Sequence, residues 1–242
     1  MSVLSPEYEA ELRSRHKDYS PSQAACRGIG EVSLITVSAP SGMGKNSVMK
    51  ETGLHTVFGF TTRPQRNEEM FGPGYNFLPN EEETYQRITD DVRNGRLMQF
   101  GVGMENYLYG SYPDEYFPSD DSGMTILDNS STGAIRMRPL PFRSITNTYL
   151  TAPFKQWIER FDRSRIQRMK DDGRTRSRIA EAYKSLGVAL EDSSFYFIEN
   201  LTGEITAAAQ KILAVASGYD VSVEHARLQA EQLRKDIKDH LL

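Results

Sequence analysis

One stretch constrains the fold more than any other: a short apolar run that stops at a loop rich in glycine and serine. Leu34, Ile35 and Val37 form the run, which is typical of a buried strand. The loop follows as APSGMGKN at residues 39–46 and is close to the phosphate-binding pattern G-x-x-x-x-G-K-[ST]. A strand, this loop and a following helix together predict a P-loop α/β fold.

The chemistry of the loop suits a phosphate chain. Gly42 and Gly44 can adopt backbone angles that a residue with a Cβ avoids, so successive N–H groups can surround phosphate oxygens. A helix starting near Lys45 adds the positive end of its dipole, and the ammonium group adds a full charge for the β- and γ-phosphates. The alternative is a chance loop before a lysine, and the preceding strand argues against it. The predicted ATP-binding residues are Ser41, Gly42, Met43, Gly44, Lys45, Asn46 and Ser47.

Two positions depart from the general pattern. Ala39 replaces the first glycine, and Asn46 replaces the hydroxyl residue that usually meets magnesium, with Ser47 one place late as a partial substitute. Asp128 ends a second apolar run, and ligands of an open α/β sheet collect beyond the carboxyl ends of its strands. We therefore predict a magnesium site at Asn46 and Asp128, the latter acting through water. A loop cap after the strand is the equally supported alternative for Asp128.

Composition limits the class of protein. The chain has 242 residues and 38% hydrophobic content, enough for a substantial core, and its net charge of −4 gives no general reason to expect nucleic-acid binding. A single cysteine, Cys26, excludes an internal disulfide and indicates a reducing compartment. No apolar run approaches the roughly 18 residues of a membrane span, and the start of the chain has no signal-peptide core. We expect a cytoplasmic protein with no nucleic-acid or membrane partner.

Further elements follow from periodicity and from helix and turn signals. Ser5 and Pro6 are suited to begin a helix, and Pro113 and Pro118 discourage one within a predicted loop at 112–123. The alternation of the later strands with helical segments predicts a parallel sheet. Strands are predicted at 97–100, 124–128, 144–150 and 195–198, and helices at 6–19, 46–51, 79–95, 203–216 and 221–242.

A second cluster of anion-binding chemistry follows the first helix. Residues 61–66 read TTRPQR, and guanidinium forks three residues apart match the oxygens of a phosphate. Taken alone, such a pair is more commonly a solvated surface. Further on come E-x-x-G at 69–72, YNF at 75–77 and NYLYGS at 106–111.

The order APSGMGK, TTRPQR, E-x-x-G-x-x-YNF and NYLYGS resembles that of guanylate kinases, a family that often has alanine where Ala39 stands. The resemblance is clear over about 33–111, continues weakly to about 213, and covers neither residues 1–30 nor the last helix. It implies a three-layer P-loop α/β fold with a parallel core sheet, an inserted NMP-binding region and an arginine-rich helical lid. It also implies a transferase that uses ATP and Mg²⁺ to phosphorylate a nucleoside monophosphate, with GMP to GDP as the first expectation.

The resemblance also implies an acceptor site. In the family, two arginines and two tyrosines hold the acceptor phosphate, and two carboxylates read guanine. The first set is kept here, whereas a neutral amide and a hydroxyl stand where the carboxylates are expected, which puts the acceptor base in doubt. The implied acceptor-binding residues are Arg63, Arg66, Tyr75, Gln99, Tyr109, Ser111 and Ser130.

The strongly basic segment around residues 157–178 matches the family's lid. Arginines three to five residues apart can share a helix face and offset the charge of a transferring phosphoryl group. A solvated helix with interleaved acids is the alternative for most of them, and Arg163 can replace Arg165 in the match. The implied catalytic residues are Lys45, Arg63, Arg160, Arg165 and Arg178.

The resemblance and the terminal segments predict the domain organisation. Residues 1–30 are an extension, a solvated arm or a packing helix, and residues 218–242 hold the last helix. Its apolar stripe of Ala226, Ala230, Leu233, Ile237 and Leu241 packs on the body or pairs with a protein partner or a second copy. The guanylate-kinase-like domain spans 31–217, with the NMP-binding region at about 57–111 and the lid at about 154–192.

Two other functions stay open. One is a kinase for another nucleotide or for a sugar phosphate. The other is a guanylate-kinase-like binding module without catalysis, which Asn46 favours because it weakens the magnesium site. Lys45 favours an enzyme, since a peptide-binding module does not need it.

Overall fold

The computed structural model describes residues 4–65, 74–103, 106–161 and 173–242. The chain forms two compact units, each described here by itself. Unit one comprises residues 1–32, 55–125 and 140–143, and unit two comprises residues 33–54, 126–139 and 144–242.

A parallel sheet forms the centre of unit two. β1 (Ser33–Ser38) pairs in parallel with β8 (Ser144–Thr151), and β8 pairs in parallel with β9 (Phe195–Glu199). The sheet also contains β7 (Met124–Asp128) and β2 (His55–Thr56), of which residues 55–56 and 124–125 are counted with unit one, and its strand order is β2-β7-β1-β8-β9. The sequence-predicted strands at 124–128, 144–150 and 195–198 and the parallel core sheet are thereby confirmed.

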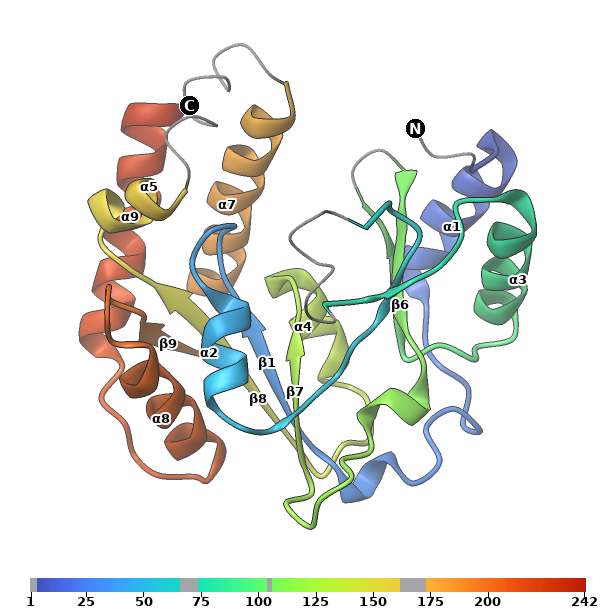
Figure 1. Ribbon diagram of the computed structural model, residues 1–242, viewed down its shortest axis with the longest axis horizontal. Helices are drawn as coiled ribbons and strands as arrows, with labels where there is room; N and C mark the ends of the chain where they lie inside the picture. The colour runs from blue at the N-terminus through green and yellow to red at the C-terminus, as the bar shows by residue number, and fades with distance from the viewer. Residues whose placement is uncertain (1–3, 66–73, 104–105, 162–172) are drawn as a thin grey trace. The chain divides into compact units, whose positions relative to one another are not determined.

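Helices cover both faces of this sheet. Figure 1 shows α2 and α8 on one side of the strands and α4 and α7 on the other, which makes the three layers expected of a P-loop α/β fold. The core between the layers includes Ile35, Val37, Leu150 and Ile212, each exposed by 1% or less. The helices of unit two are α2 (Lys45–Glu51), α4 (Ser131–Met137), α5 (Phe154–Arg160), α7 (Gly173–Glu191), α8 (Ile205–Ala216) and α9 (Glu224–Leu241).

The last helix, α9, packs on unit two itself. Of its apolar stripe, Ala226, Ala230, Leu233 and Ile237 are buried, and Leu241 is partly buried against the same core. α9 lies against α7 and β9. The structure thus favours packing on the body, and pairing with a partner through this stripe would require the helix to detach.

Unit one is built on a smaller sheet with strand order β4-β3-β6-β5. Its antiparallel pairs set Phe60 of β3 opposite Gly110 of β6, and Gln99 of β5 opposite Ser111 of β6. Its elements are α1 (Pro6–Asp18), the 3₁₀ helix η1 (Ile29–Glu31), β3 (Phe60–Thr61), β4 (Asn76–Phe77), α3 (Glu82–Arg93), β5 (Gln99–Val102), β6 (Leu108–Ser111) and the 3₁₀ helix η4 (Pro113–Tyr116). η4 lies within the predicted loop at 112–123.

The N-terminal helix belongs to this unit's core. The Ser5 side chain accepts a hydrogen bond from the Tyr8 N–H, and Pro6 stands in the first turn, as the sequence predicts. Leu12 is fully buried in a cluster with Tyr85 and Ile88 of α3. Of the two expectations for this segment, the packing helix is therefore the one that the structure shows.

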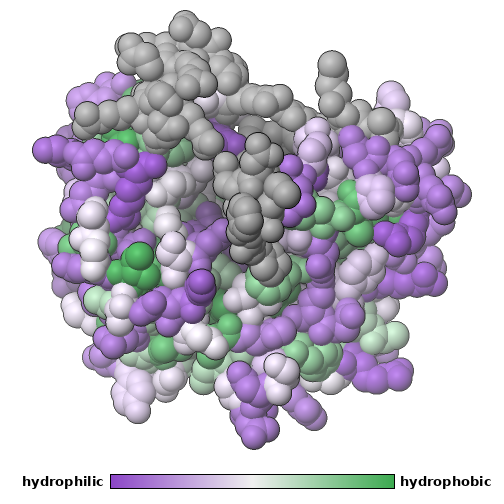
Figure 2. All heavy atoms as spheres, viewed as in Figure 1, coloured by the Kyte–Doolittle hydropathy of each residue, from purple (hydrophilic) through white to green (hydrophobic). Residues whose placement is uncertain are grey.

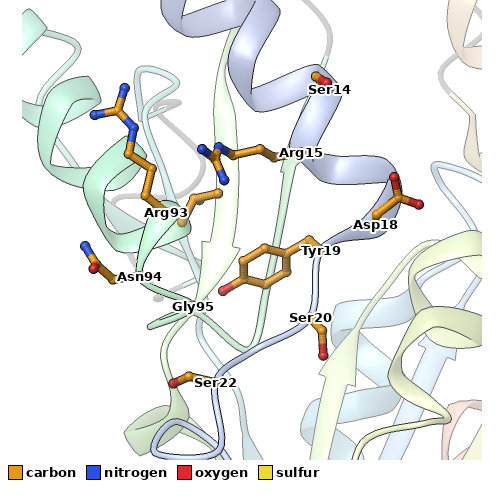
Figure 3. Close-up of a pocket in the computed structure, with 10 residues that line it drawn as sticks. Ser14, Arg15, Asp18, Tyr19, Ser20, Ser22, Arg93, Asn94 and Gly95 are labelled. Carbon is orange, nitrogen blue, oxygen red and sulfur yellow. The ribbon is translucent and has the colours of Figure 1, made fainter.

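The chain after α1 runs past the end of α3. Figure 3 shows Tyr19, Ser20 and Ser22 on one side of a cavity of about 520 Å³, with Arg93 and Asn94 on the other. The guanidinium groups here are paired, because Arg15 and Arg93 both contact the carboxylate of Glu11 at 2.9 Å or less. Glu11 of α1 thus links the Arg15 side chain of its own helix to the Arg93 side chain at the end of α3.

Tyr19 explains why β5 begins two residues later than predicted. Its hydroxyl donates to the Leu97 carbonyl at 2.7 Å and accepts from the Leu97 N–H at 3.1 Å, so both backbone groups of Leu97 are occupied outside the strand ladder. Burial raises the pKa of Tyr19 to about 12, so the hydroxyl keeps the proton that it donates.

The face of the molecule drawn in Figure 2 is mostly polar. In the view of Figure 2, hydrophobic residues form small separate patches between hydrophilic ones, consistent with a mean hydropathy of −0.55. Within the described residues, no helix has both the length and the apolar character needed to span a membrane.

The Tyr19 contact gives a first prediction. Tyr19→Phe leaves the Leu97 N–H and C=O without this partner and should lower the free energy of unfolding of unit one by about 1–3 kcal/mol. Urea denaturation measures the change. Tyr219→Phe is the control, since Tyr219 is 71% exposed and should shift stability by less than about 0.5 kcal/mol. Equal effects of the two substitutions would show that the Tyr19 hydroxyl does not stabilise the unit.

Candidate functional site

The glycine-rich loop of unit two has the geometry that its sequence predicts. β1 ends at Ser38, α2 begins at Lys45, and Gly42 and Gly44 have φ angles of 82° and 86°. A Cβ on Gly44 would lie 2.9 Å from Nδ2 of Asn200, closer than real side chains approach. Glycine is therefore required at position 44 by both backbone angle and space.

Lys45 and Asp128 meet at the end of the sheet. Nζ of Lys45 lies 3.6 Å from Oδ1 of Asp128 and donates a hydrogen bond to the Ala39 carbonyl at 3.2 Å. Burial raises the pKa of the Asp128 carboxyl, and the charge of Lys45 opposes that increase. The strand-end position predicted for Asp128 is confirmed, and it puts a carboxylate beside the positive charge of the loop.

The oxygen donors around this pair suit a magnesium ion held jointly with phosphates. Asn46 and Ser47 are exposed at the start of α2, and Asp128 is partly exposed. Across the residues that the structure describes, no group of three His, Cys, Asp or Glu side chains could hold a metal by itself. Magnesium commonly uses one or two carboxylates and completes its shell with phosphate oxygens and water, which this donor set permits. The metal role of Asn46 and Asp128 stays a prediction.

Three of the predicted acceptor residues form one cluster in unit one. The guanidinium carbon of Arg63 lies 5.5 Å from the ring centroid of Tyr75 and 5.2 Å from that of Phe77. The rings of Tyr75 and Tyr109 meet edge to face at 5.7 Å. Arg63 is only 9% exposed, so the aromatic rings hold a nearly buried positive charge. Arg66, the fourth member of the predicted clamp, lies outside the described residues.

Ser111 and Gln99 face each other across β5 and β6, but their environments differ. Ser111 is fully buried, and its Oγ shares a hydrogen bond of 2.8 Å with the hydroxyl of Tyr116. Gln99 is half-buried. The buried bond gives Ser111 a structural role inside unit one, so its role as a phosphate ligand stays a prediction.

Ser130 belongs to unit two and caps a helix that the sequence analysis missed. Its Oγ accepts the Gly133 N–H at 3.0 Å at the start of α4. A serine followed by seven helical residues carries little periodic signal, although the capping residue itself was a usable clue. Its role in reading a base stays a prediction.

The predicted lid arginines are only partly described. Arg160 ends α5, and its guanidinium donates to Oγ1 of Thr202 at 3.1 Å. Burial lowers the pKa of Arg160. Arg178 is half-buried within α7. Arg165, together with the alternative Arg163, lies outside the described residues.

Two loop contacts come from residues that the sequence analysis did not select as site residues. The indole Nε1 of Trp157 donates to the Ser41 carbonyl at 2.9 Å, and the side-chain amide of Asn200 donates to the Met43 carbonyl at 2.7 Å. These partners lie 116 and 157 positions from the loop residues that they contact. Sequence spacing therefore gave no signal for either contact.

Glu115, in η4, links this 3₁₀ helix to β4. One carboxylate oxygen accepts from Nδ2 of Asn76 and the other from the Tyr112 N–H. Burial raises the pKa of Glu115 to about 7, the charge of Asp114 adds to the increase, and the two hydrogen bonds oppose it. This carboxyl accordingly changes charge near neutral pH.

Known proteins resemble this chain in sequence and in fold. No protein-family model matches the chain. A curated guanylate kinase of Chlorobium luteolum is 24% identical over 190 residues, which is 76% of this chain and 91% of that protein. A guanylate kinase of Onion yellows phytoplasma is 26% identical over 201 residues, 80% of this chain and 87% of that protein. The crystal structure of guanylate kinase from Anaplasma phagocytophilum matches with a TM-score of 0.52 at 18% identity, covering 77% of this chain and 85% of that one.

The parallel sheet with helices on both faces and the glycine-rich loop thus define a P-loop α/β protein with the fold of a nucleotide kinase. Within that class, the chain is related to the guanylate kinases over most of its length.

The pKa of Glu115 gives a prediction about pH. From about pH 7 down to about 4.5, the folded state binds a proton here that the unfolded state does not, so stability rises as pH falls. The gain is therefore lost as pH rises from about 4.5 through about 7 and the contribution is flat above that, with a slope between these values of at most about 1.4 kcal/mol per pH unit, reduced by solvent screening. Urea denaturation from pH 5 to 8 should show this slope in the native protein.

Glu115→Gln separates this carboxyl from the others, because it cannot ionise. The variant should have a flatter dependence of unfolding free energy on pH over the same range. Asp121→Asn removes an exposed carboxyl of the same unit and serves as the control. A Glu115→Gln curve parallel to that of the native protein would mean that Glu115 has an ordinary pKa.

Proposed function

We propose that the protein transfers the γ-phosphoryl group of ATP to a nucleoside monophosphate, with GMP as the first acceptor and GDP as the product. The observation that carries this proposal is the glycine loop at the end of β1, with Lys45 at the head of α2 beside Asp128. The relatives named guanylate kinase support it.

The donor side of the reaction rests on the loop. Its backbone N–H groups and Lys45 would bind the phosphates of ATP, and the N-terminus of α2 would favour their negative charge. Asn46 and Asp128 would hold Mg²⁺, which neutralises charge on the donor phosphates. Lys45 reaches this position on a helix fixed by Val48 and Met49 in the core, so its charge is set in place before a nucleotide binds.

The acceptor side rests on the cluster of Arg63, Tyr75 and Tyr109. One guanidinium and two phenol hydroxyls can satisfy a dianionic phosphate, and Arg66 would add a second fork. Contact with the rings of Tyr75 and Phe77 orders the Arg63 side chain, which lowers the entropy lost on binding. The ordered positive charge of Arg63 favours an acceptor that carries a phosphate group.

Catalysis would come from positioning and charge, as in phosphoryl transfer generally. The reaction breaks the bond between the γ-phosphorus and the bridging oxygen of ATP and forms a bond to an oxygen of the acceptor phosphate, with no covalent enzyme intermediate. Arg160, Arg165 and Arg178 would offset the charge on the phosphoryl group in transit. We also propose that the protein acts in the cytoplasm.

A second candidate changes only the acceptor. Gln99 and Ser130 stand where the guanylate kinase resemblance implies carboxylates, and Ser130 already caps α4. That observation favours another nucleotide or a sugar phosphate as an alternative acceptor. A coupled assay of ADP release against GMP, AMP, CMP, UMP, dGMP and a sugar phosphate distinguishes these cases. ADP release with none of them would support the non-catalytic binding module instead.

Loss of the loop charge should stop transfer. Lys45→Ala is expected to lower kcat by at least about 10²–10³-fold, the range found for removing one electrostatic stabiliser of a transition state. The fold should persist, because Lys45 is only partly buried and its ammonium group contacts the Ala39 carbonyl of the loop and the Asp128 carboxylate.

Lys50→Ala is the matched control, since Lys50 is exposed in the same helix. It should keep native turnover. Circular dichroism should show that both variants are folded. If it does and Lys45→Ala still has near-native turnover, Lys45 has no role in the mechanism.

The base-reading positions give a separate prediction. Hydrogen bonds to charged groups contribute about 1.5–3 kcal/mol against about 1 for neutral ones, so Gln99 and Ser130 should cost about 1–4 kcal/mol of guanine discrimination. Gln99→Glu with Ser130→Asp should therefore raise the ratio of kcat/KM for GMP over AMP. Aspartate also caps helices well, so α4 should be kept.

Gln210→Glu is the control, because Gln210 is exposed on α8. It adds a carboxylate without changing the predicted base site. If the native protein already strongly prefers GMP and the double variant lowers that preference, the base site lies elsewhere.

A further inference from the structure

Two buried side chains hold the carbonyl groups of the phosphate loop. Trp157, on α5, is 1% exposed, and its Nε1 donates to the Ser41 carbonyl at 2.9 Å. Asn200, the residue after β9, is 2% exposed, and its Nδ2 donates to the Met43 carbonyl at 2.7 Å. Both contacts lie within unit two. Two separate elements thus bind alternate peptide groups of one short loop.

The planarity of the peptide group converts these contacts into a constraint on N–H directions. In a trans peptide, the carbonyl of one residue and the N–H of the next point in opposite directions. The described residues contain no cis peptide bond. Fixing the Ser41 carbonyl therefore aims the Gly42 N–H away from Trp157, and fixing the Met43 carbonyl aims the Gly44 N–H away from Asn200.

Such a constraint matters because glycine peptides rotate easily. Gly42 and Gly44 have φ angles of 82° and 86°, in a region where glycine moves between conformations at little cost. The intervening Met43 N–H is bonded to the Pro40 carbonyl at 3.2 Å. This backbone bond does not involve the Ser41–Gly42 or the Met43–Gly44 peptide group. The contacts from Trp157 and Asn200 fix these two groups instead.

Packing reinforces the same arrangement. The ring of Phe161 lies 3.2 Å from the position of a Cβ on Gly42 and packs against the Trp157 ring in a tilted orientation, with 5.4 Å between centroids. Nδ2 of Asn200 lies 2.9 Å from the equivalent position on Gly44. Each glycine is thus closed on the side where a side chain would stand.

A purely packing role does not account for Asn200. Its Oδ1 is buried, and among the described atoms it has no hydrogen-bond partner. Burying an unpaired amide oxygen costs stability, so an apolar residue would pack there more favourably. What the amide group contributes at this position is the hydrogen bond from its nitrogen to the Met43 carbonyl.

We propose that Trp157 and Asn200 are positioning residues that hold the phosphate loop in its binding conformation, with the Gly42 and Gly44 N–H groups directed at the phosphates of the nucleotide. The role of the phosphates rests on the proposed function, whereas the hold on the two carbonyls belongs to the protein without ligand. Neither side chain needs to touch the nucleotide.

The test uses the whole chain and variants that remove a donor and put an apolar side chain in its place. Trp157→Phe removes the indole N–H, and Asn200→Leu removes the amide. Tyr149→Phe is the matched control, since it removes a buried donor of unit two that bonds Ser185 and not the loop. For each protein, two-dimensional ¹H–¹⁵N NMR gives the Gly42 and Gly44 amide shifts without ligand. Calorimetry then gives the Kd of inorganic triphosphate and of ATP.

Both donor-removing variants should displace the Gly42 or Gly44 amide resonance and weaken triphosphate binding by about 5- to 10-fold, the effect of one hydrogen bond. In steady-state assays the KM for ATP should rise while the KM for the acceptor stays unchanged. Tyr149→Phe should leave the shifts and both KM values at native levels.

Glycine resonances and triphosphate affinity that match the Tyr149→Phe control in both variants would overturn the proposal. Trp157 is the single tryptophan, so its indole proton gives one resonance in the native protein. Exchange of that proton at the rate of free indole would also overturn the proposal, even if a variant fails to fold. Failure of the native protein to bind ATP or triphosphate would instead defeat the proposed function, while the glycine shifts would still test the hold on the loop.

Discussion

The parallel pairing of β1 with β8 is the interaction on which the rest of unit two depends. It runs the length of β1, from Ser33 opposite Ser144 to Ser38 opposite Tyr149. Because β1 is held along its whole length, the loop that follows leaves from a fixed point at the carboxyl end of the sheet. The side chains of β1 that point between the layers, such as Ile35 and Val37, are fully covered, which gives the loop a rigid base.

Local sequence predicted the parts of this arrangement that depend on local physics. The apolar run before the loop, the two glycines and the capping residues of α1 each act over a few residues, and the structure has them where expected. The long-range contacts were not predictable in this way. Trp157 read as one member of a basic segment, and nothing near Asn200 pointed to the loop, because each meets its partner only after the sheet has formed.

The candidate acceptor residues show the same division. Motif order indicated Arg63, Tyr75 and Tyr109, and the structure brings these three together. Spacing alone could not distinguish a side chain that faces a ligand from one that faces the core, which is the case of Ser111 beneath Tyr116. The N-terminal extension was also underestimated, since Leu12 and Tyr19 stabilise the same unit that carries the acceptor cluster.

The central claim is that the γ-phosphoryl group passes from ATP to a nucleoside monophosphate. The most direct measurement follows γ-³²P-labelled ATP in the presence of Mg²⁺ and GMP, with the products separated by chromatography. The label should appear in GDP and not on the protein. Label found only in inorganic phosphate, or remaining in ATP with every acceptor supplied, would contradict it.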